Sequence, residues 1–170
     1  PNFGTFVHTS YDLLDPNTFF VDHPEYYSVR NEERRAPHGI EWEVGEIMNA
    51  HEDLKSQLCY SNPEVAAALI EELRRRMREH PECRIWGVSQ MDWLYDCQCA
   101  RCRALVEREG SAIGPILMCV NEIADALKDE FPDNYIETLA YAYTRTPPKH
   151  IRPRDNVVIS LCNIECNMLY

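Results

Sequence analysis

Short apolar runs rich in β-branched and aromatic residues alternate along the chain with longer amphipathic segments. This alternation is typical of βα units, in which helices connect parallel strands. The apolar runs predict five strands, at Gly4 to Thr9, Gln57 to Ser61, Arg84 to Met91, Tyr135 to Tyr143 and Asn156 to Ile164.

The segments between these runs predict three helices. The first follows the motif SNPEV, in which Ser61 or Asn62 can cap the helix and Pro63 suits its first turn. The others cover about Arg101 to Glu109 and about Pro115 to Glu130, and the last of these has apolar residues at helical spacing that we expect to pack in the core.

Parallel strands joined by helices form either an open doubly wound sheet or a (β/α)8 TIM barrel. No Gly-rich turn follows a predicted strand, and polar residues gather where the strands end, which in a barrel is the catalytic mouth. Both features favour the barrel. Five strands instead of eight predict a partial barrel over residues 1–170, with a long βα loop at about 10–56 and a Cys-rich loop at about 92–103.

The ends of the chain indicate a piece of a longer protein. The chain starts at Pro1 without an initiator Met and stops soon after an apolar run. An opened barrel would expose unpaired strand edges and apolar helix faces. We therefore expect residues 1–170 alone to be inactive.

Net charge changes the range of partners. The chain has 17 Lys and Arg against 28 Asp and Glu, a formal charge of −11 at pH 7. This charge repels phosphate backbones, and nearby glutamates offset the basic run from Arg74 to Arg78, so we expect no nucleic-acid partner. No stretch approaches the roughly 20 apolar residues of a membrane helix, so we expect no membrane span.

Two acidic residues follow predicted strands. Glu165 ends the buried run VVISLCNIEC, where desolvation would raise its carboxyl pKa toward that of a general acid. Asp92 follows RIWGVSQMD in the same way, and Gln90 lies two residues earlier on the same strand face. Two carboxylates at one mouth can divide acid, base and stabilising roles. A salt-bridged glutamate and a loop-capping aspartate are the structural alternatives.

Aromatic residues stand near these carboxylates. Tyr141 and Tyr143 alternate on TLAYAYT, which predicts that both point to one face of a strand, and Trp93 directly follows Asp92. Aromatic faces suit sugar binding, although core packing is an equal alternative. His8 ends the first predicted strand, where it would contact substrate or cap the next loop.

The run CQCARC places Cys97, Cys99 and Cys102 in one short loop. This spacing lets three thiolates converge on one tetrahedral ion, so we expect a structural zinc site. Cys59 or Cys83, a histidine or water would supply the fourth ligand. Free thiols or a single disulfide are the alternatives.

Six motifs in order, HTSYDLLDP, HPEYYS, QLCYSNPEV, VSQMDW with CQCARC, LAYAYTRTPPKHIRPRDNVVI and LCNIEC, give the chain a family resemblance. Over nearly its whole length it resembles the bacterial domain-of-unknown-function family 4838. The best-understood members form glycoside hydrolase family 163, endo-β-N-acetylglucosaminidases of the TIM-barrel type that act on complex N-glycans. At Met91 the chain departs from the usual Asn of this motif, which changes an expected substrate contact.

The resemblance implies hydrolysis of β-linked N-acetylglucosamine with help from the sugar's own 2-acetamido oxygen. One acid protonates the leaving oxygen and then activates water, and a second group orients the acetamido group. The resemblance puts the acid/base role on Glu165 and the orienting role on Asp92. Tyr141, Tyr143 and Gln90 would then bind sugar hydroxyls or the acetamido group, as part of a site for a glycan or glycoprotein substrate.

Several alternatives remain open at this stage. The same mouth would serve a non-catalytic carbohydrate-binding barrel, a glycosidase of other specificity using a plain two-carboxylate mechanism, or a zinc-stabilised interaction module. The glycosidase chemistry requires no cofactor, so a zinc ion would serve only to pin the loop that carries Trp93. The sequence itself assigns no compartment, and the resemblance implies a bacterial periplasmic or cell-surface protein.

Overall fold

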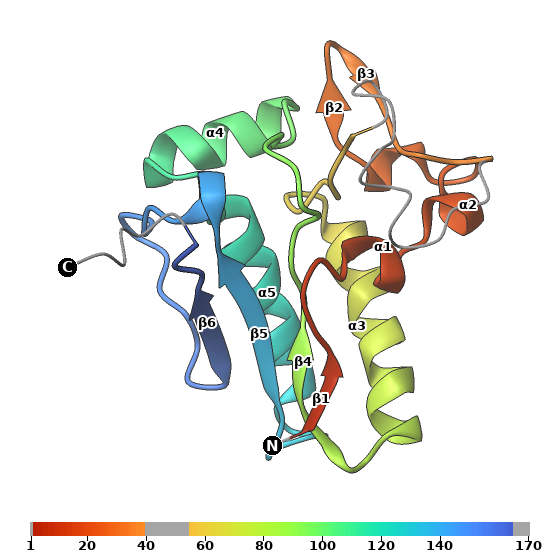
Figure 1. The fold of residues 1–170 in the computed structure, drawn as a ribbon, viewed down its shortest axis with the longest axis vertical. Coiled ribbons are helices and arrows are strands. Elements are labelled where there is room, and N and C mark those ends of the chain that lie inside the picture. The colour runs from red at the N-terminus through yellow and green to blue at the C-terminus, as the bar shows by residue number, and fades with distance from the viewer. Residues whose placement is uncertain (1, 40–54, 165–170) are drawn as a thin grey trace.

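A four-stranded parallel sheet forms the centre of the molecule (Figure 1). The computed structural model describes residues 2–39 and 55–164. Each neighbouring pair of strands in the sheet is parallel, so the predicted α/β class and parallel pairing are confirmed. In sheet order the strands are β1 (Asn2–Thr5), β4 (Cys83–Gly87), β5 (Tyr135–Ala140) and β6 (Val157–Leu161).

Three helices form where the sequence predicts them: α3 (Pro63–Glu79), α4 (Ala100–Glu109) and α5 (Ile113–Leu127). Asn62 caps α3, because its side chain accepts a hydrogen bond from the backbone N–H of Glu64 at 3.2 Å. Gly110 ends α4 with a φ of 65°, a left-handed conformation that glycine adopts without strain.

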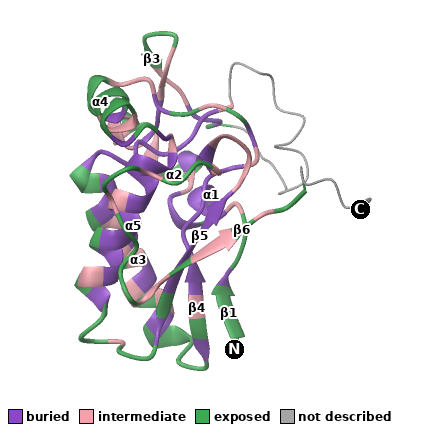
Figure 2. Cartoon of the chain, turned by 90° about the vertical axis from the view of Figure 1, so that its left-hand side faces the viewer, coloured by how far each residue is buried: buried purple, intermediate pink, exposed green. Residues whose placement is uncertain are grey.

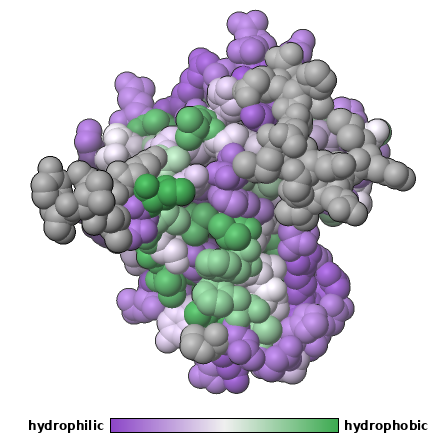
Figure 3. All heavy atoms as spheres, viewed as in Figure 1, coloured by the Kyte–Doolittle hydropathy of each residue, from purple (hydrophilic) through white to green (hydrophobic). Residues whose placement is uncertain are grey.

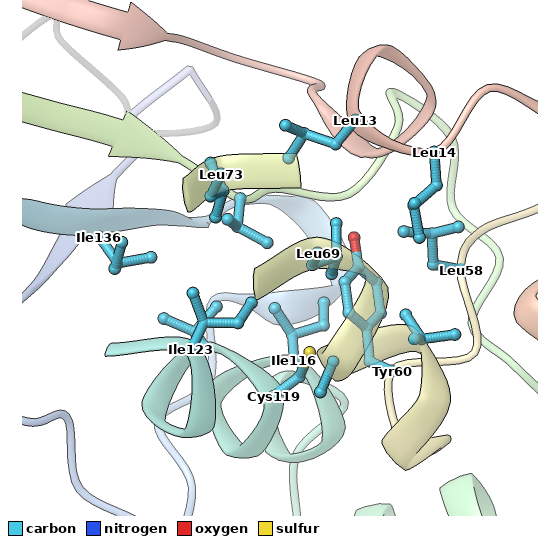
Figure 4. Close-up of a cluster of buried hydrophobic side chains, with 14 of the residues drawn as sticks. Leu13, Leu14, Leu58, Tyr60, Leu69, Leu73, Ile116, Cys119, Ile123 and Ile136 are labelled. Carbon is cyan, nitrogen blue, oxygen red and sulfur yellow. The ribbon is translucent and has the colours of Figure 1, made fainter. Parts of the chain in front are cut away.

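Helices α3 and α5 pack together on one face of the sheet (Figure 2). Their apolar stripes meet the strands in one hydrophobic core (Figure 4). Leu69 and Leu73 of α3, Ile123 of α5 and Ile136 of β5 are almost fully buried there. Burial of each such side chain stabilises the fold by about 1.5–3 kcal/mol, and this burial holds the sheet and the helices as one unit.

The basic run of α3 is neutralised by ion pairs. Arg76 bonds Glu72 one turn earlier at 2.6 Å and Asp12 of the N-terminal region at 2.6 Å. Glu130 pairs with Arg74 and Arg78. The predicted offset of these positive charges is therefore confirmed. None of the helices in the described part of the chain is long and apolar enough to cross a membrane.

The opposite face of the sheet carries no helix among the described residues, and hydrophobic side chains gather over it (Figure 3). Phe3 and Val158 are two strand residues with exposed side chains, at 45% and 37%. Glu137 of β5 is nevertheless almost fully buried, and neither of its carboxylate oxygens has a hydrogen-bond partner in the described structure. Burial raises the pKa of Glu137, and the nearby Ser160 hydroxyl only partly opposes this.

The predicted strand from Gln57 to Ser61 is wrong. This buried segment makes a single isolated bridge, between Leu58 and Tyr27, and joins no sheet. Its residues are buried because side chains on both sides of the segment pack or form hydrogen bonds. A short buried run gives the same hydrophobic signal whether it is a strand or an irregular segment.

The long connection after β1, predicted as a βα loop, contains several short elements. They begin with helices α1 and α2 and continue with a one-turn 3-10 helix and a small hairpin. Residues 40–54 of the predicted loop lie outside the described residues. The elements are α1 (Ser10–Leu13), α2 (Pro16–Phe19), η1 (Pro24–Tyr26), β2 (Val29–Arg30) and β3 (Glu33–Arg34).

The connection from β5 to β6 contains only the 3-10 turn η4 (Ala142–Thr144) and a Pro-rich segment. Glu109 anchors this segment, because its buried carboxylate accepts the backbone N–H groups of His150 at 2.8 Å and Ile151 at 3.0 Å. Burial favours the neutral acid, but these two bonds together with Arg108 outweigh it and lower the pKa of Glu109 to about 2.

Candidate functional site

The carboxyl edge of the sheet brings together three side chains from three neighbouring strands. His8 follows β1, Asp92 follows β4 and Tyr141 directly follows β5. The Tyr141 hydroxyl donates a hydrogen bond to Asp92 Oδ1 at 2.9 Å, and His8 Nε2 lies 3.8 Å from the same oxygen. The predicted convergence of strand-end residues is therefore present for these three.

Asp92 remains open to a ligand. Its side chain is 32% exposed, and no described residue donates a hydrogen bond to its second oxygen, Oδ2. A carboxylate with one oxygen fixed and one free can accept an N–H or O–H from a bound molecule. Tyr141 thus sets the orientation of Asp92 and leaves Oδ2 able to accept from a bound molecule.

His8 has a defined tautomer. Its Nδ1 lies 2.8 Å from the carbonyl oxygen of Gln90, and because a carbonyl can only accept, Nδ1 carries the proton. Nε2, which faces Asp92, is then the basic nitrogen of the neutral ring. Protonation of Nε2 would convert the His8–Asp92 contact into an ion pair. The ring also meets Tyr141 edge-on, with centroids 5.9 Å apart.

Left-handed backbone conformations flank this site. Val7, His8 and Ala142 have φ values of 57°, 54° and 49°. For a β-branched residue such as Val7 this conformation is a steric outlier. Each such residue costs about 1–3 kcal/mol and persists only where its surroundings hold it. Strain of this kind gathers at binding and catalytic sites, so it marks the same sheet edge independently of the side chains.

Hydrogen bonds from side chains hold the strained segment after β1. The Thr9 hydroxyl donates to the carbonyl oxygen of Gly87 at 2.9 Å and accepts the N–H of Ser89 at 3.0 Å. The Ser10 hydroxyl donates to the carbonyl oxygen of Ser89 at 2.6 Å. These buried bonds replace the strand ladder beyond β1 and fix the position of His8 against the end of β4.

Gln57 holds the loop that carries Asp92. Its buried amide donates to the carbonyl oxygens of Met91 at 3.1 Å and Trp93 at 3.3 Å, and its oxygen accepts the N–H of Met91 at 2.8 Å. Gln57 therefore forms hydrogen bonds with the residues on both sides of Asp92. Sequence reasoning missed this role, since an isolated Gln in an apolar run gives no signal of the loop it will meet.

Gln90 and Trp93 lie beneath the site and are buried. Gln90 is inaccessible to solvent, and its amide donates to the Thr144 hydroxyl at 2.8 Å. The Trp93 indole N–H donates to the carbonyl oxygen of Ser56, and its ring packs 6.0 Å from that of Tyr11. These contacts hold the loops at the carboxyl edge of the sheet in place. Sugar contacts from the side chains of Gln90 and Trp93 stay predictions.

The predicted pairing of Tyr141 and Tyr143 on one strand face is wrong. Strand β5 ends at Ala140, and the 3-10 turn that follows separates the two rings. Tyr141 reaches Asp92, whereas Tyr143 lines a separate hollow with Tyr60 and Cys102, and burial raises the pKa of its hydroxyl. Strand alternation fails here because η4 interrupts the extended chain. Glu165 lies outside the described residues.

An open hollow lies beside His8. It has a volume of about 470 Å³ and is lined by His8, Tyr11 and Met91 together with Asp12 and Asp15. This volume is in the range of pockets that bind small molecules. The hollow mixes aromatic and apolar surface with carboxylates.

A second cluster lies at the start of α4, where four cysteines meet. The sulfur atoms of Cys59, Cys97, Cys99 and Cys102 lie within 4.8 Å of one another, so this group can hold a metal ion. The structure thus selects Cys59 from the alternatives for a fourth ligand. Cys83 lies elsewhere, with its thiol against the carbonyl oxygen of Phe3. Hydrogen bonds from Cys102 and Cys97 lower the pKa of Cys59, while Cys59 and Cys97 raise that of Cys102.

Comparison with known proteins gives one match. No curated protein and no solved structure matches the chain. A family model matches residues 1–169, almost the whole sequence. The chain therefore belongs to the family described as a domain of unknown function (DUF4838).

Proposed function

We propose that this chain forms part of a glycoside hydrolase barrel that cleaves β-linked N-acetylglucosamine in N-glycans. The observation that carries the proposal is the Asp92–Tyr141–His8 group at the carboxyl edge of parallel strands, in which His8 also lines an open hollow. In barrel enzymes this edge holds the catalytic residues. Fold analogy supplies the reaction class, and the resemblance of the motifs supplies the substrate.

The order of the strands supports a barrel. The strands run β1, β4, β5, β6 across the sheet in chain order, and α3 and α5 cover the same face. A doubly wound sheet reverses its strand order and places helices on both faces. Consecutive units of a (β/α)8 barrel would have this strand order, and the face opposite α3 and α5 would then be the barrel interior.

Asp92 suits the orienting role in a substrate-assisted reaction. Its free Oδ2 can accept the acetamido N–H of the sugar while Tyr141 keeps Oδ1 in place. The acetamido oxygen then attacks the anomeric carbon, the bond to the leaving oxygen breaks, and the negative Asp92 stabilises the positive oxazolinium ring that forms. Glu165, by resemblance, donates a proton to the leaving oxygen. It later takes a proton from the water that opens the ring.

Glycan release tests the proposal. The protein at its natural length is incubated with a complex-type N-glycoprotein, beside the variants Asp92→Asn and Glu165→Gln, and products are measured by mass spectrometry. Asp133→Asn is the matched control, because Asp133 is an exposed acid just before the opposite, amino end of β5. We expect release that leaves one N-acetylglucosamine on the protein, with wild-type rates in the control and losses in the other two variants.

The other outcomes are equally informative. Equal release by wild type and Asp92→Asn would remove Asp92 from the reaction. An absence of release from N-glycoproteins and from other β-linked N-acetylglucosamine substrates, with retained glycan binding, would replace the enzyme by the carbohydrate-binding barrel.

A further inference from the structure

We infer that Cys59, Cys97, Cys99 and Cys102 together bind one zinc ion, which ties the start of α3 to the loop between β4 and α4. The inference is independent of the proposed reaction, since it rests on a cluster away from Asp92. Three of these cysteines lie within six residues of one another, and Cys59 reaches them from 40 residues before Cys99.

The spacing of the sulfur atoms fits a tetrahedral ion. Zinc binds thiolate sulfur at about 2.3 Å, and tetrahedral angles then place each pair of sulfurs about 3.8 Å apart. The sulfurs of Cys59 and Cys99 are 3.6 Å apart, and all four lie within 4.8 Å of one another. A disulfide would bring two sulfurs to about 2.05 Å and leave the other two without a partner. The arrangement is therefore that of one four-ligand site.

The groups around the cluster suit bound thiolates. The backbone N–H of Val29 donates to Cys97 Sγ at 3.3 Å, and the N–H of Cys102 donates to Cys99 Sγ at 3.4 Å. Donors of this kind orient metal-bound sulfur. Arg34 interacts with Cys59, and its guanidinium also lies near Cys97 and Cys99. Four thiolates around Zn²⁺ carry a net charge of −2, which a neighbouring guanidinium partly offsets.

The ion would be structural. Cys59, Cys97 and Cys102 are at most 5% exposed, and four protein ligands leave no position for a water molecule or a substrate. Zinc accepts four thiolates without redox chemistry, whereas magnesium and calcium require oxygen ligands. The donor set therefore fits zinc and not magnesium or calcium, and elemental analysis separates zinc from iron, which four thiolates also bind.

The site lies where the fold has little regular structure. Cys59 is two residues after Gln57, and Cys99 is the N-cap residue of α4. The hairpin of β2 and β3 joins the same corner, because Gln98 donates its N–H to the carbonyl oxygen of Val29 at 2.8 Å. One ion would thus connect two segments that no common sheet or helix holds together, and the hairpin attaches to them through hydrogen bonds.

Metal analysis of the purified protein tests the inference. The protein at its natural length is prepared without a metal-affinity tag or added metal, and zinc is measured by mass spectrometry of the elements. Cys99→Ser is the test variant, since serine preserves the N-cap of α4 while removing one thiolate. Cys162→Ser is the matched control, because Cys162 lies outside the cluster.

We expect the wild type and the control to hold the same zinc, and Cys99→Ser to lose one ion per chain at a chelator concentration that leaves the control loaded. Cobalt exchange should give thiolate-to-cobalt charge-transfer absorption in the wild type and weaken it in Cys99→Ser. Equal zinc in the variant and the control would overturn the inference. So would a wild type without zinc, whether its thiols are free or joined in disulfides.

If Cys99→Ser fails to fold, a second measurement on the wild type tests the inference. Titration with a mercurial reagent should release zinc in step with four thiols per ion. Release that is complete before these thiols react would also overturn the inference.

Discussion

The loop that carries Asp92 depends on the buried amide of Gln57, and Gln57→Leu tests this dependence. Leucine has a similar volume but makes no hydrogen bond. The variant removes all three bonds between Gln57 and the backbone of Met91 and Trp93. The carbonyl oxygen of Met91 keeps a second bond, from the N–H of Trp93 at 2.8 Å. The N–H of Met91 and the carbonyl oxygen of Trp93 lose their partners.

The expected loss of stability follows from these two groups. Each buried polar group left without a partner costs about 1–3 kcal/mol. The leucine side chain buries more apolar surface than the amide, and this stabilises the variant by about 1 kcal/mol. The free energy of unfolding should therefore fall by about 3 kcal/mol. With a urea m-value of about 2 kcal/mol/M, the unfolding midpoint falls by about 1.5 M.

Urea unfolding followed by tryptophan fluorescence measures this loss. Gln98→Leu is the matched control, because Gln98 is only partly buried and accepts one bond, from the exposed N–H of Asn31 at 3.1 Å. Its free energy of unfolding should stay within about 0.5 kcal/mol of wild type. A Gln57→Leu midpoint equal to that of the control, with an unchanged m-value, would show that the loop does not depend on the amide.

Three further predictions concern charge. Burial raises the pKa of Glu137, so the folded chain holds a proton that the unfolded chain releases above pH 4.5, and wild type loses stability as the pH rises. The variant Glu137→Gln should therefore unfold at a higher temperature than wild type at pH 7, and at the same temperature below pH 4. The pKa of Glu109 is lowered instead, so its carboxylate stabilises the fold at neutral pH. Wild type should be more stable than Glu109→Gln at pH 7, and thermal unfolding should show this advantage shrinking as pH falls from 4.5 towards 2. Tyr141→Phe removes a bond to the charged Asp92, so kcat for glycan release should fall about 10–100-fold, and an unchanged kcat would contradict the assigned orientation.

Local sequence signals predicted the helices and most of the sheet. Asn62 and Pro63 mark the start of α3, and Gly110 follows α4, because caps and turns depend on a few adjacent residues. The strands were predicted too long at their carboxyl ends. Strand β5 was expected to continue to Tyr143 but ends at Ala140, since the chain beyond it bonds to side chains instead of a neighbouring strand.

The candidate site was predictable only in part. Strand-end position brought His8, Asp92 and Tyr141 together correctly, because parallel strands share one carboxyl edge. The support by Gln57 was not predictable, since it depends on a contact between residues 34 positions apart. Cysteine spacing indicated three ligands, and only the folded chain shows that Cys59 completes the group.

Strain and support at the site are connected. The left-handed backbone at Val7 and His8 would relax if nothing opposed it, because each such residue costs about 1–3 kcal/mol. Buried bonds from Thr9 and Ser10 to the backbone after β4 oppose that relaxation. Gln57, which belongs to no sheet, fixes the Asp92 loop through a separate set of bonds to the backbone of Met91. His8 also bonds the carbonyl oxygen of Gln90, two residues before Asp92, so both side chains are held against the same end of β4. Their 3.8 Å contact is therefore set by the folded chain before any ligand arrives.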